Sequence, residues 1–445
     1  MEAVMDDWRW MTAEALGKSI AAGGIDPIDL CEVFLKAIAE HPDAKRIYTT
    51  VTENRARAEA KAASARAASG LRRGPLDGVP VSWKDLFDSA GTVTEAGTRM
   101  LAGRVPERDA HVLENATAAG LVCLGKTHMS EIAFSGLGIN PITATPPNRN
   151  NHDAVPGGSS SGAAASVAFG LAAAAIGSDT GGSVRIPAAW NDLTGFKTTH
   201  GRLPLDGTVP LCLTFDTIGP LCRSVTDAAL LVAALEGARA PDLTAPRRDL
   251  NLAILDTVAM HDLAPETRTA FDAAVRDLKR AGATVSHLKF APLEEAFGFA
   301  GPLYTADAWA WWRDLITGHP GVMFGQIEER VTAGRDVTAA DYISNWTRLR
   351  DIRTAFATAA APYDALLMPT ASILPPEVAR LMADNDYYKV QNLAALRNTR
   401  IANLMDLPAV TLPTATKSCG IMLCGQKGRD DALLRVARAA ELALA

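Results

Sequence analysis

Short apolar runs alternate with longer stretches of helical pattern along most of this chain, and this alternation limits the fold more than any other feature. The runs that read as strands lie at residues 79–84, 120–124, 173–176, 252–255, 285–288, 365–368 and 409–412. Strands that alternate with helices favour an α/β sheet with helices covering both of its faces. We therefore expect an α/β fold built on one central sheet.

The intervening segments carry helix signals of their own. Asp26 before Pro27 is a good N-cap followed by proline at the first helical position. Apolar residues recur at helical spacing in segments that we predict as helices, at 28–38, 53–68, 112–119, 163–171, 265–281, 295–360 and 430–444. Residues 236–250 are rich in Pro, Arg and Asp and read as a surface linker. No repeat and no clean break in composition divides the chain, so we expect one large domain over residues 1–445.

Composition excludes several classes of protein. Of the 445 residues, 48% are apolar and 21% charged, which is typical of a folded globular chain and too apolar for a disordered one. The net charge of −6 comes with no basic stripe, so we expect no nucleic-acid partner. The longest apolar stretch, 163–176, is shorter than the roughly 18 residues of a membrane span, so we expect no membrane segment. The N-terminus has no apolar core of a secretory signal.

The six cysteines point to a reduced environment. None forms a CxxC pair, and none has the spacing of a zinc site with neighbouring histidines. We interpret them as reduced, mostly buried thiols of a cytoplasmic protein, and we expect no metal.

Three features carry candidate chemistry: the run Gly157-Gly158-Ser159-Ser160-Ser161-Gly162, the run from Ser178 to Pro187 (SDTGGSVRIP), and Lys84. A phosphate site is disfavoured because neither GxxxxGK[ST] nor GxGxxG after a strand occurs. No GxSxG elbow holds a serine for a Ser-His-Asp triad. His152 and His200 lie in polar loops and nothing selects either as a base, so a histidine triad is left as an open alternative.

A Ser-Ser-Lys arrangement fits these features better. A serine hydroxyl needs a base to become a nucleophile, and a lysine is a base only when its amine is neutral. Lys84 lies among apolar residues, so burial can lower its pKa toward neutrality. Gly181 and Gly182 allow the backbone N–H groups before Ser183 to turn toward a substrate and form an oxyanion hole. Ser159 can pass a proton between Lys84 and Ser183 because a hydroxyl both donates and accepts.

These motifs resemble the amidase signature family. The resemblance is carried by 78–85 (GVPVSWKD), 125–141, 157–170 (GGSSSGAAASVAFG), 177–204 and 215–231, with further similarity at 363–370 and 399–413. It implies a single large domain with a central mixed β-sheet covered by helices on both faces. Within it, residues of about 78–227 would form the catalytic core, and a variable region of about 236–360 would shape the substrate pocket.

The resemblance also implies roles for individual residues. Ser183 would be the acylated nucleophile, Ser159 a bridging serine after a cis peptide, and Lys84 the general base and acid. The backbone N–H groups of the oxyanion hole would come from Thr180, Gly181, Gly182 and Ser183. The residues that support the loops would be Ser160, Asp179 and Arg185. We expect Asp179 and Arg185 to be scaffold ions that hold the loop in shape rather than participants in the chemistry.

The implied activity is hydrolysis of the C–N bond of a small carboxylic amide, without a metal or organic cofactor. An alternative is the glutaminase (A) subunit of a tRNA-dependent amidotransferase, although the shorter chain and GGSSSG in place of GGSSGG favour a free-standing amidase. A catalytically silent scaffold is a third option, against which the intact Lys84, Ser159 and Ser183 argue. The cluster Trp309, Trp311 and Trp312 is expected in the core rather than around a substrate. A homodimer is suggested by analogy alone. The amide itself is not readable.

Overall fold

Eleven strands form one sheet in the computed structural model, which describes residues 7–247 and 249–445. The order across the sheet is β1-β3-β2-β4-β6-β5-β10-β11-β9-β7-β8. The strands are β1 (Tyr48–Val51), β2 (Pro80–Lys84), β3 (Val122–Thr127), β4 (Ala174–Ser178), β5 (Thr194–Lys197), β6 (Ile218–Cys222), β7 (Asn251–Leu255), β8 (Thr284–Leu288), β9 (Ala365–Pro369), β10 (Ala409–Pro413) and β11 (Gly420–Cys424). Parallel pairs such as β2–β4 lie beside antiparallel pairs such as β4–β6, so the sheet is mixed, as expected.

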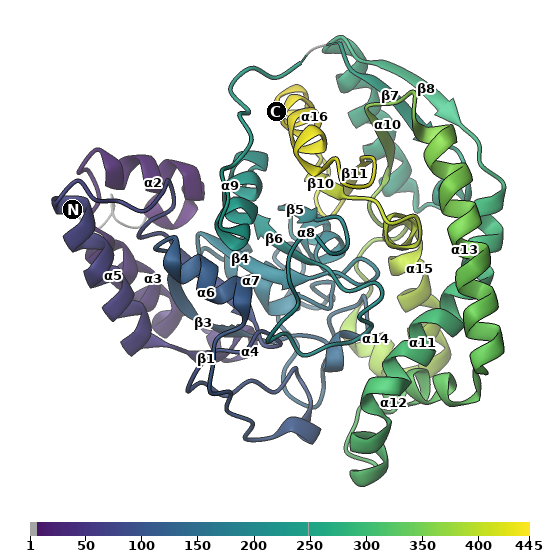
Figure 1. The fold of residues 1–445 in the computed structure, drawn as a ribbon, viewed down its shortest axis with the longest axis horizontal. Helices are drawn as coiled ribbons and strands as arrows, with labels where there is room; N and C mark the ends of the chain where they lie inside the picture. Colours follow the sequence, from purple (N-terminus) through teal and green to yellow (C-terminus); the bar gives the residue numbers. More distant parts are fainter. Residues whose placement is uncertain (1–6, 248) are drawn as a thin grey trace.

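Helices flank this sheet and close both ends of the molecule (Figure 1). They are α2 (Ala13–Ala21), α3 (Pro27–Glu40), α4 (Ala44–Ile47), α5 (Glu53–Ala68), α6 (His111–Ala118), α7 (Ser161–Ala168), α8 (Arg185–Trp190), α9 (Val225–Glu236), α10 (Pro265–Arg280), α11 (Pro292–Gly318), α12 (Gly325–Thr332), α13 (Ala339–Ala360), α14 (Val378–Ala383), α15 (Asn385–Leu404) and α16 (Asp430–Leu444). Figure 1 shows α2, α3 and α5 gathered at one end and α11, α12 and α13 at the other. None of the described helices is long and apolar enough to span a membrane.

At β4 the two faces of the sheet pack into different apolar clusters. Successive residues of a strand point to opposite faces. In β4, Ala175 belongs to a small cluster with Ala163, Ala164 and Val167 of α7, whereas Ile176 belongs to the main core. α7 and α8 therefore cover one face, while α9, α16 and α10 pack against β6, β10 and β9 on the other. The expectation of helices on both faces is confirmed.

The sequence signals for element ends act as expected at α3. Asp26 accepts a hydrogen bond of 2.8 Å from the backbone N–H of Ile28, and Pro27 opens the helix.

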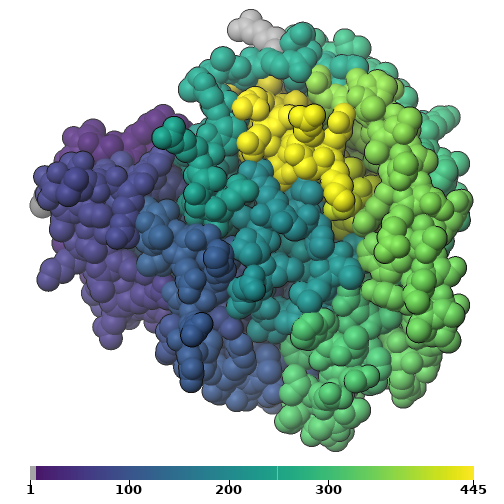
Figure 2. Space-filling view, viewed as in Figure 1, coloured from purple at the N-terminus to yellow at the C-terminus, as the bar shows by residue number. Residues whose placement is uncertain are grey.

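All six cysteines are unpaired and buried. The space-filling view shows the C-terminal helix, in yellow, seated between the teal and green segments (Figure 2), where α16 contacts α9 and α10. The two ends of the chain thus belong to one folded body.

Some elements were predicted with shifted bounds and others were missed. The strand expected at 120–124 is β3, at Val122–Thr127, and the helix expected at 163–171 is α7, which already ends at Ala168. The apolar patterns carried no signal for β1, β5, β6, β11, α9 or α15. The division into a core of 78–227 and a variable region of 236–360 stays a prediction.

The arrangement of β2 and β4 decides where chemistry can occur. They are parallel neighbours, with Val81 opposite Ala174 and Trp83 opposite Ile176. The carboxyl ends of parallel strands meet at the same edge of a sheet, where α/β proteins commonly place their ligands. Lys84 ends β2 and Ser178 ends β4, so the two candidate motifs converge at this edge.

The contact between β5 and β6 leaves no room for a side chain at Gly219. A Cβ atom there would lie 1.9 Å from the carbonyl oxygen of Phe196. We expect Gly219→Ala to lower the free energy of unfolding by about 1–3 kcal/mol or more, because the strands must separate to admit the methyl group. Urea unfolding measures this change. Gly298→Ala is the matched control, since a Cβ on this exposed residue of α11 meets nothing within 4 Å. It should stabilise the protein by about 0.5–1 kcal/mol, and equal effects of the two variants would contradict the prediction.

Candidate active site

The carboxyl ends of β2 and β4 bring a lysine and two serines together. The Lys84 side chain is fully buried. Its Nζ donates a hydrogen bond of 2.6 Å to Ser159 Oγ and another of 2.8 Å to Ser178 Oγ. The sequence predicts the first of these contacts. Ser178 is a second partner that it does not predict.

Two loops meet beside this lysine. The peptide bond between Gly158 and Ser159 is cis, as the resemblance implies. The backbone N–H of Ser160 donates to the carbonyl of Ser183 at 3.2 Å, and Ser160 Oγ donates to the carbonyl of Ser178 at 3.3 Å. Ser160 therefore ties the loop of residues 157–160 to the loop that carries Ser183.

Ser183 lines a small cavity of about 20 Å³ together with Thr180 and Gly181. The backbone N–H groups of residues 180–183 form no hydrogen bond within the part of the chain that the structure describes. Gly182 has a φ of +142°, and a Cβ atom on it would lie 2.1 Å from Thr399 Oγ1, so the close packing of this loop requires glycine. Unpaired N–H groups beside a hydroxyl can stabilise negative charge on a substrate oxygen.

Burial sets the charge of Lys84. Removal of the amine from water lowers the pKa of Lys84 from its usual value of 10.5 to about 7, and the negative charges of Asp216 and Asp179 offset part of this effect. Near pH 7 a large fraction of the side chain is therefore neutral. A neutral amine has two N–H donors and one lone pair, so it can donate to Ser178 while it accepts a proton from Ser159.

A buried ion pair holds the loop that carries Ser183. Arg185 donates to both carboxylate oxygens of Asp179, at 2.8 and 3.0 Å, and neither side chain is exposed. Arg185 also donates to the carbonyl of Thr399 at 2.7 Å and to Asn403 Oδ1 at 2.6 Å, which links the loop to α15. Arg185 does not line the cavity at Ser183. Its contacts are those of a scaffold.

Asp216 belongs to the site although the sequence did not single it out. It accepts a hydrogen bond from the hydroxyl of Thr180, and its other oxygen accepts from the backbone N–H groups of Leu211 and Cys212 at 2.9 and 3.0 Å. Burial raises the pKa of Asp216 to about 6, against the opposing effect of these hydrogen bonds. Asp216 lies in the segment FDTIGP, which follows the run SDTGGSVRIP along the chain. This position is the signal that could have identified it.

Three helices far along the chain supply part of the cavity wall. The wall includes Tyr304 of α11, Arg330 of α12, and Leu396 and Arg400 of α15. Tyr304 Oη donates to the carbonyl of Thr180 at 3.0 Å, which fixes α11 against the Ser183 loop. A second cavity of about 330 Å³ adjoins the first and shares Tyr304, Arg330 and Arg400 with it. Helical periodicity does not reveal which residues face a cavity, so the sequence missed all of them.

The tryptophan cluster lies away from this cavity. Trp312 is buried and its Nε1 donates to the carbonyl of Pro210 at 3.0 Å, and Trp309 packs against the main core. The expectation of a core position is confirmed for these two residues and is wrong for Trp311, which is 51% exposed. None of the three lines the cavity at Ser183.

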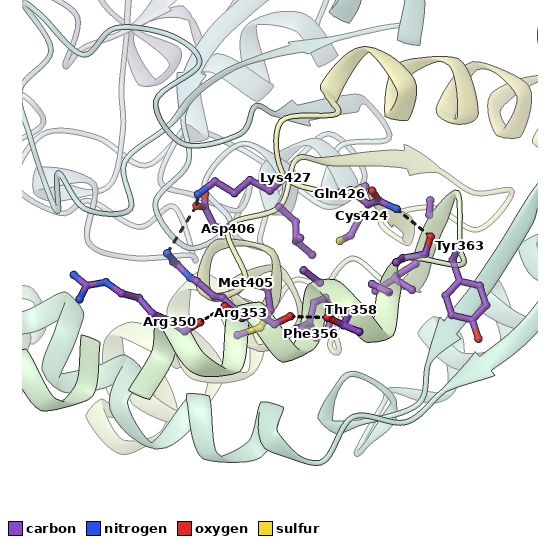
Figure 3. Close-up of a pocket in the computed structure, with 18 residues that line it drawn as sticks. Arg350, Arg353, Phe356, Thr358, Tyr363, Met405, Asp406, Cys424, Gln426 and Lys427 are labelled. Carbon is purple, nitrogen blue, oxygen red and sulfur yellow. Dashed lines mark hydrogen bonds and ion pairs between the residues drawn. The ribbon is translucent and has the colours of Figure 1, made fainter. Parts of the chain in front are cut away.

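A larger cavity of about 910 Å³ lies elsewhere, between α13 and the segments 405–407 and 424–427 (Figure 3). Asp406 in its lining contacts Lys427 at 2.7 Å and Arg353 at 3.8 Å. It contains none of the motif serines and not Lys84. Size alone therefore does not locate the site. Within residues 7–247 and 249–445, no group of three or more His, Cys, Asp or Glu side chains could hold a metal ion.

Comparison with known proteins agrees with this geometry. The family model described as Amidase matches residues 29–434. The chain belongs to the amidase family. It is 33% identical to the A subunit of glutamyl-tRNA(Gln) amidotransferase from Anaeromyxobacter sp. (strain K), over 96% of this chain and 94% of that protein. It is also 33% identical to 2-amino-5-chloromuconic acid deaminase of Comamonas testosteroni, over 88% and 87% of the two chains.

Solved structures of the amidase family share the fold. A structure described as the crystal structure of amidase superposes with a TM-score of 0.88 at 29% identity, and covers 98% of this chain and 100% of that one. Membership makes this protein an amidase-family hydrolase of C–N bonds.

The ion pair of Asp179 and Arg185 generates a stability prediction. Asp179→Asn leaves a buried guanidinium without its carboxylate, so we expect a loss of about 3–5 kcal/mol in the free energy of unfolding. Glu32→Gln is the control, because the pair of Glu32 with Arg57 is about half exposed, and its loss should change stability by no more than about 1 kcal/mol.

The ion pair of Asp179 and Arg185 also predicts how the stability difference between wild type and Asp179→Asn depends on pH. Burial disfavours the Asp179 carboxylate, but the charge and hydrogen bonds of Arg185 outweigh this and lower the pKa of Asp179 to about 2. A carboxyl group with a depressed pKa stabilises the fold above its unfolded pKa of about 3.9 and stops doing so as the pH falls through its folded value. The gap between wild type and Asp179→Asn should therefore narrow from pH 4 toward pH 2 in denaturant titrations. A gap that widens in acid would contradict this.

Proposed function

We propose that this protein hydrolyses the C–N bond of a small carboxylic amide through an acyl-enzyme on Ser183, with Ser159 and Lys84 as the proton relay. The observation that carries the proposal is the hydrogen bond of 2.6 Å between a buried lysine, whose pKa is lowered to about 7, and the serine of the first motif. Burial of the lysine and unused backbone N–H groups beside Ser183 support the same chemistry.

The reaction follows from where protons can go. Neutral Lys84 takes the proton of Ser159 as Ser159 takes that of Ser183, whose oxygen attacks the amide carbonyl. The N–H groups of Thr180, Gly181, Gly182 and Ser183 stabilise the oxyanion. As the C–N bond breaks, the relay returns the proton to the leaving ammonia or amine.

Deacylation reverses the relay. Water gives one proton through Ser159 to Lys84 and attacks the acyl carbon, and Ser183 recovers its proton as the acid leaves. The proposed chemistry requires no cofactor. Residues 78–227 supply its groups, and part of the proposed variable region, 236–360, supplies cavity wall through Tyr304 and Arg330. A location in the cytoplasm and a homodimeric assembly stay predictions.

A second candidate is the glutaminase subunit of a tRNA-dependent amidotransferase. The identity of 33% to the corresponding amidotransferase protein of Anaeromyxobacter over nearly the whole chain favours it. The sequence GGSSSG in place of GGSSGG favours the free-standing enzyme. Affinity purification from the native cell separates the two, because stoichiometric recovery with a tRNA-binding subunit supports the amidotransferase.

Ser183→Ala tests the role of the proposed nucleophile. We expect kcat/KM for amide hydrolysis to fall by roughly 10,000-fold or more, because no acyl-enzyme can form. A panel of amides of graded size, assayed for ammonia release, measures it. Ser161→Ala is the matched control: Ser161 begins α7 and its hydroxyl donates to the carbonyl of His128 at 3.4 Å, so activity should be retained. Substantial turnover by Ser183→Ala, or no labelling of Ser183 by a fluorophosphonate, would refute the assignment.

The lowered pKa of Lys84 predicts an acid limb in the pH profile. The base form is the neutral amine, so kcat/KM should rise with pH, with an apparent pKa near 7, and then level off. Asp216 carries a negative charge that raises the pKa of Lys84, so Asp216→Asn should move this limb to lower pH. A limb that does not move would indicate a different base, such as a histidine. Lys84→Met should lower kcat by about 100-fold to 10,000-fold.

A further inference from the structure

Two arginines share the cavity at Ser183. Arg330 comes from α12 and Arg400 from α15, and both line the cavity at Ser183 and the adjoining one of about 330 Å³. Arg400 is only 8% exposed. Burial, together with the nearby charge of Arg400, lowers the pKa of Arg330 to about 9, so it keeps its charge at neutral pH. Two like charges therefore face one small space beside the proposed nucleophile.

Neither arginine has a carboxylate partner among residues 7–247 and 249–445. Arg330 donates to the carbonyl of Phe134 at 2.9 Å and lies 4.1 Å from the centre of its ring. Arg400 lies 5.7 Å from the centre of the Tyr304 ring and forms no ion pair or hydrogen bond with a described residue. Aromatic rings compensate a guanidinium only partly, because a cation–π contact offsets only part of the cost of removing the charge from water.

Some buried cations of this chain are paired with carboxylates. Arg185 is paired with Asp179, and Lys126 with Asp85 at 3.3 Å. In the cavity of Figure 3, Asp406 forms ion pairs with Lys427 and Arg353. A buried charge without a partner is costly, so it is normally paired. Lys197 is also buried without a carboxylate partner in the described part of the chain, but it donates to the carbonyls of Thr198 and Leu407. Among the described residues, Arg400 has neither a carboxylate partner nor a hydrogen-bond acceptor, so its N–H groups are available to a ligand.

The cavity suits an anion and not a cation. The residues that line it are Ala133, Phe134, Ser135, Thr180, Gly181, Ser183, Leu211, Tyr304, Arg330, Leu396 and Arg400, and none of them is acidic. Glu329, the acid of the adjoining cavity, pairs with Lys389 at 2.8 Å. An ammonium group near Ser183 would therefore meet two guanidinium groups and no carboxylate.

We propose that Arg400 and Arg330 bind a carboxylate on the acyl part of the substrate, which is the monoamide of a short dicarboxylic acid without an α-ammonium group. This inference rests on the proposed function and names the substrate class of the same site. A guanidinium binds a carboxylate through two parallel N–H···O bonds. Ser183 and the two arginines line the same cavity, so the chain between the amide and the carboxylate is short. Water adds across the C–N bond, and the products are the dicarboxylate and ammonia.

The first test compares succinamate with succinamide, its neutral counterpart, and with L-glutamine on the wild-type protein. We expect kcat/KM for succinamate to exceed both others by roughly 10- to 100-fold, as for hydrogen bonds to charged groups. Arg400→Met should raise KM for succinamate and remove this preference, so that kcat/KM for the two amides becomes about equal. Arg397→Met is the control: it lies on the same helix, pairs with Asp262 and lines neither cavity, so the preference should remain. Equal rates for succinamate and succinamide would overturn the inference.

The second test measures binding without turnover. Ser183→Ala protein is titrated with succinamate and with succinamide by isothermal calorimetry. We expect saturable binding of succinamate, weakened at least about 10-fold when Arg400→Met or Arg330→Met is added. Equal binding of the two amides, or no effect of either arginine, would overturn the inference and leave the Ser183 mechanism standing. Turnover retained by Ser183→Ala would refute the mechanism whatever the calorimetry shows.

Discussion

The burial of one amine at the end of β2 is the constraint from which the rest of the site follows. In water Lys84 would be charged and useless as a base, whereas inside the protein its pKa is lowered to about 7. The parallel pairing of β2 and β4 holds this amine between Ser159 and Ser178. The charges of Asp179 and Asp216 keep the pKa of Lys84 from falling further. The sheet therefore sets both the position and the protonation of the group.

The loop that carries Ser183 is held from the far end of the sequence. Arg185 joins Asp179 of the loop to Thr399 and Asn403 of α15, more than 200 residues away. Thr399 Oγ1 also donates to the carbonyl of Gly181 at 2.7 Å. The backbone N–H groups beside Ser183 are consequently pre-oriented, without a hydrogen bond from the described chain that a substrate would have to displace.

Sequence reasoning reached the residues whose chemistry is local and missed those placed by tertiary contacts. Lys84 ends an apolar strand, and Ser159 and Ser183 lie in glycine-rich turns. Residue type and neighbouring sequence are therefore enough to identify these three residues. β5 and β6 were missed because each contains glycine, β6 also contains proline, and neither shows polar–apolar alternation. Arg330 and Arg400 lie on separate helices, 70 residues apart, and only the folded chain brings them to one cavity.

Part of the cavity wall comes from a different stretch of polypeptide than the reacting groups. Lys84, Ser159 and Ser183 lie in the first half of the chain, whereas Tyr304, Arg330, Leu396 and Arg400 belong to helices that follow it. Substrate selectivity can therefore change between homologues while the catalytic groups stay the same. Exchanging Arg330, Leu396 and Arg400 between homologues offers a route to new specificities. The contacts of α11 and α15 that hold the Ser183 loop would stay in place.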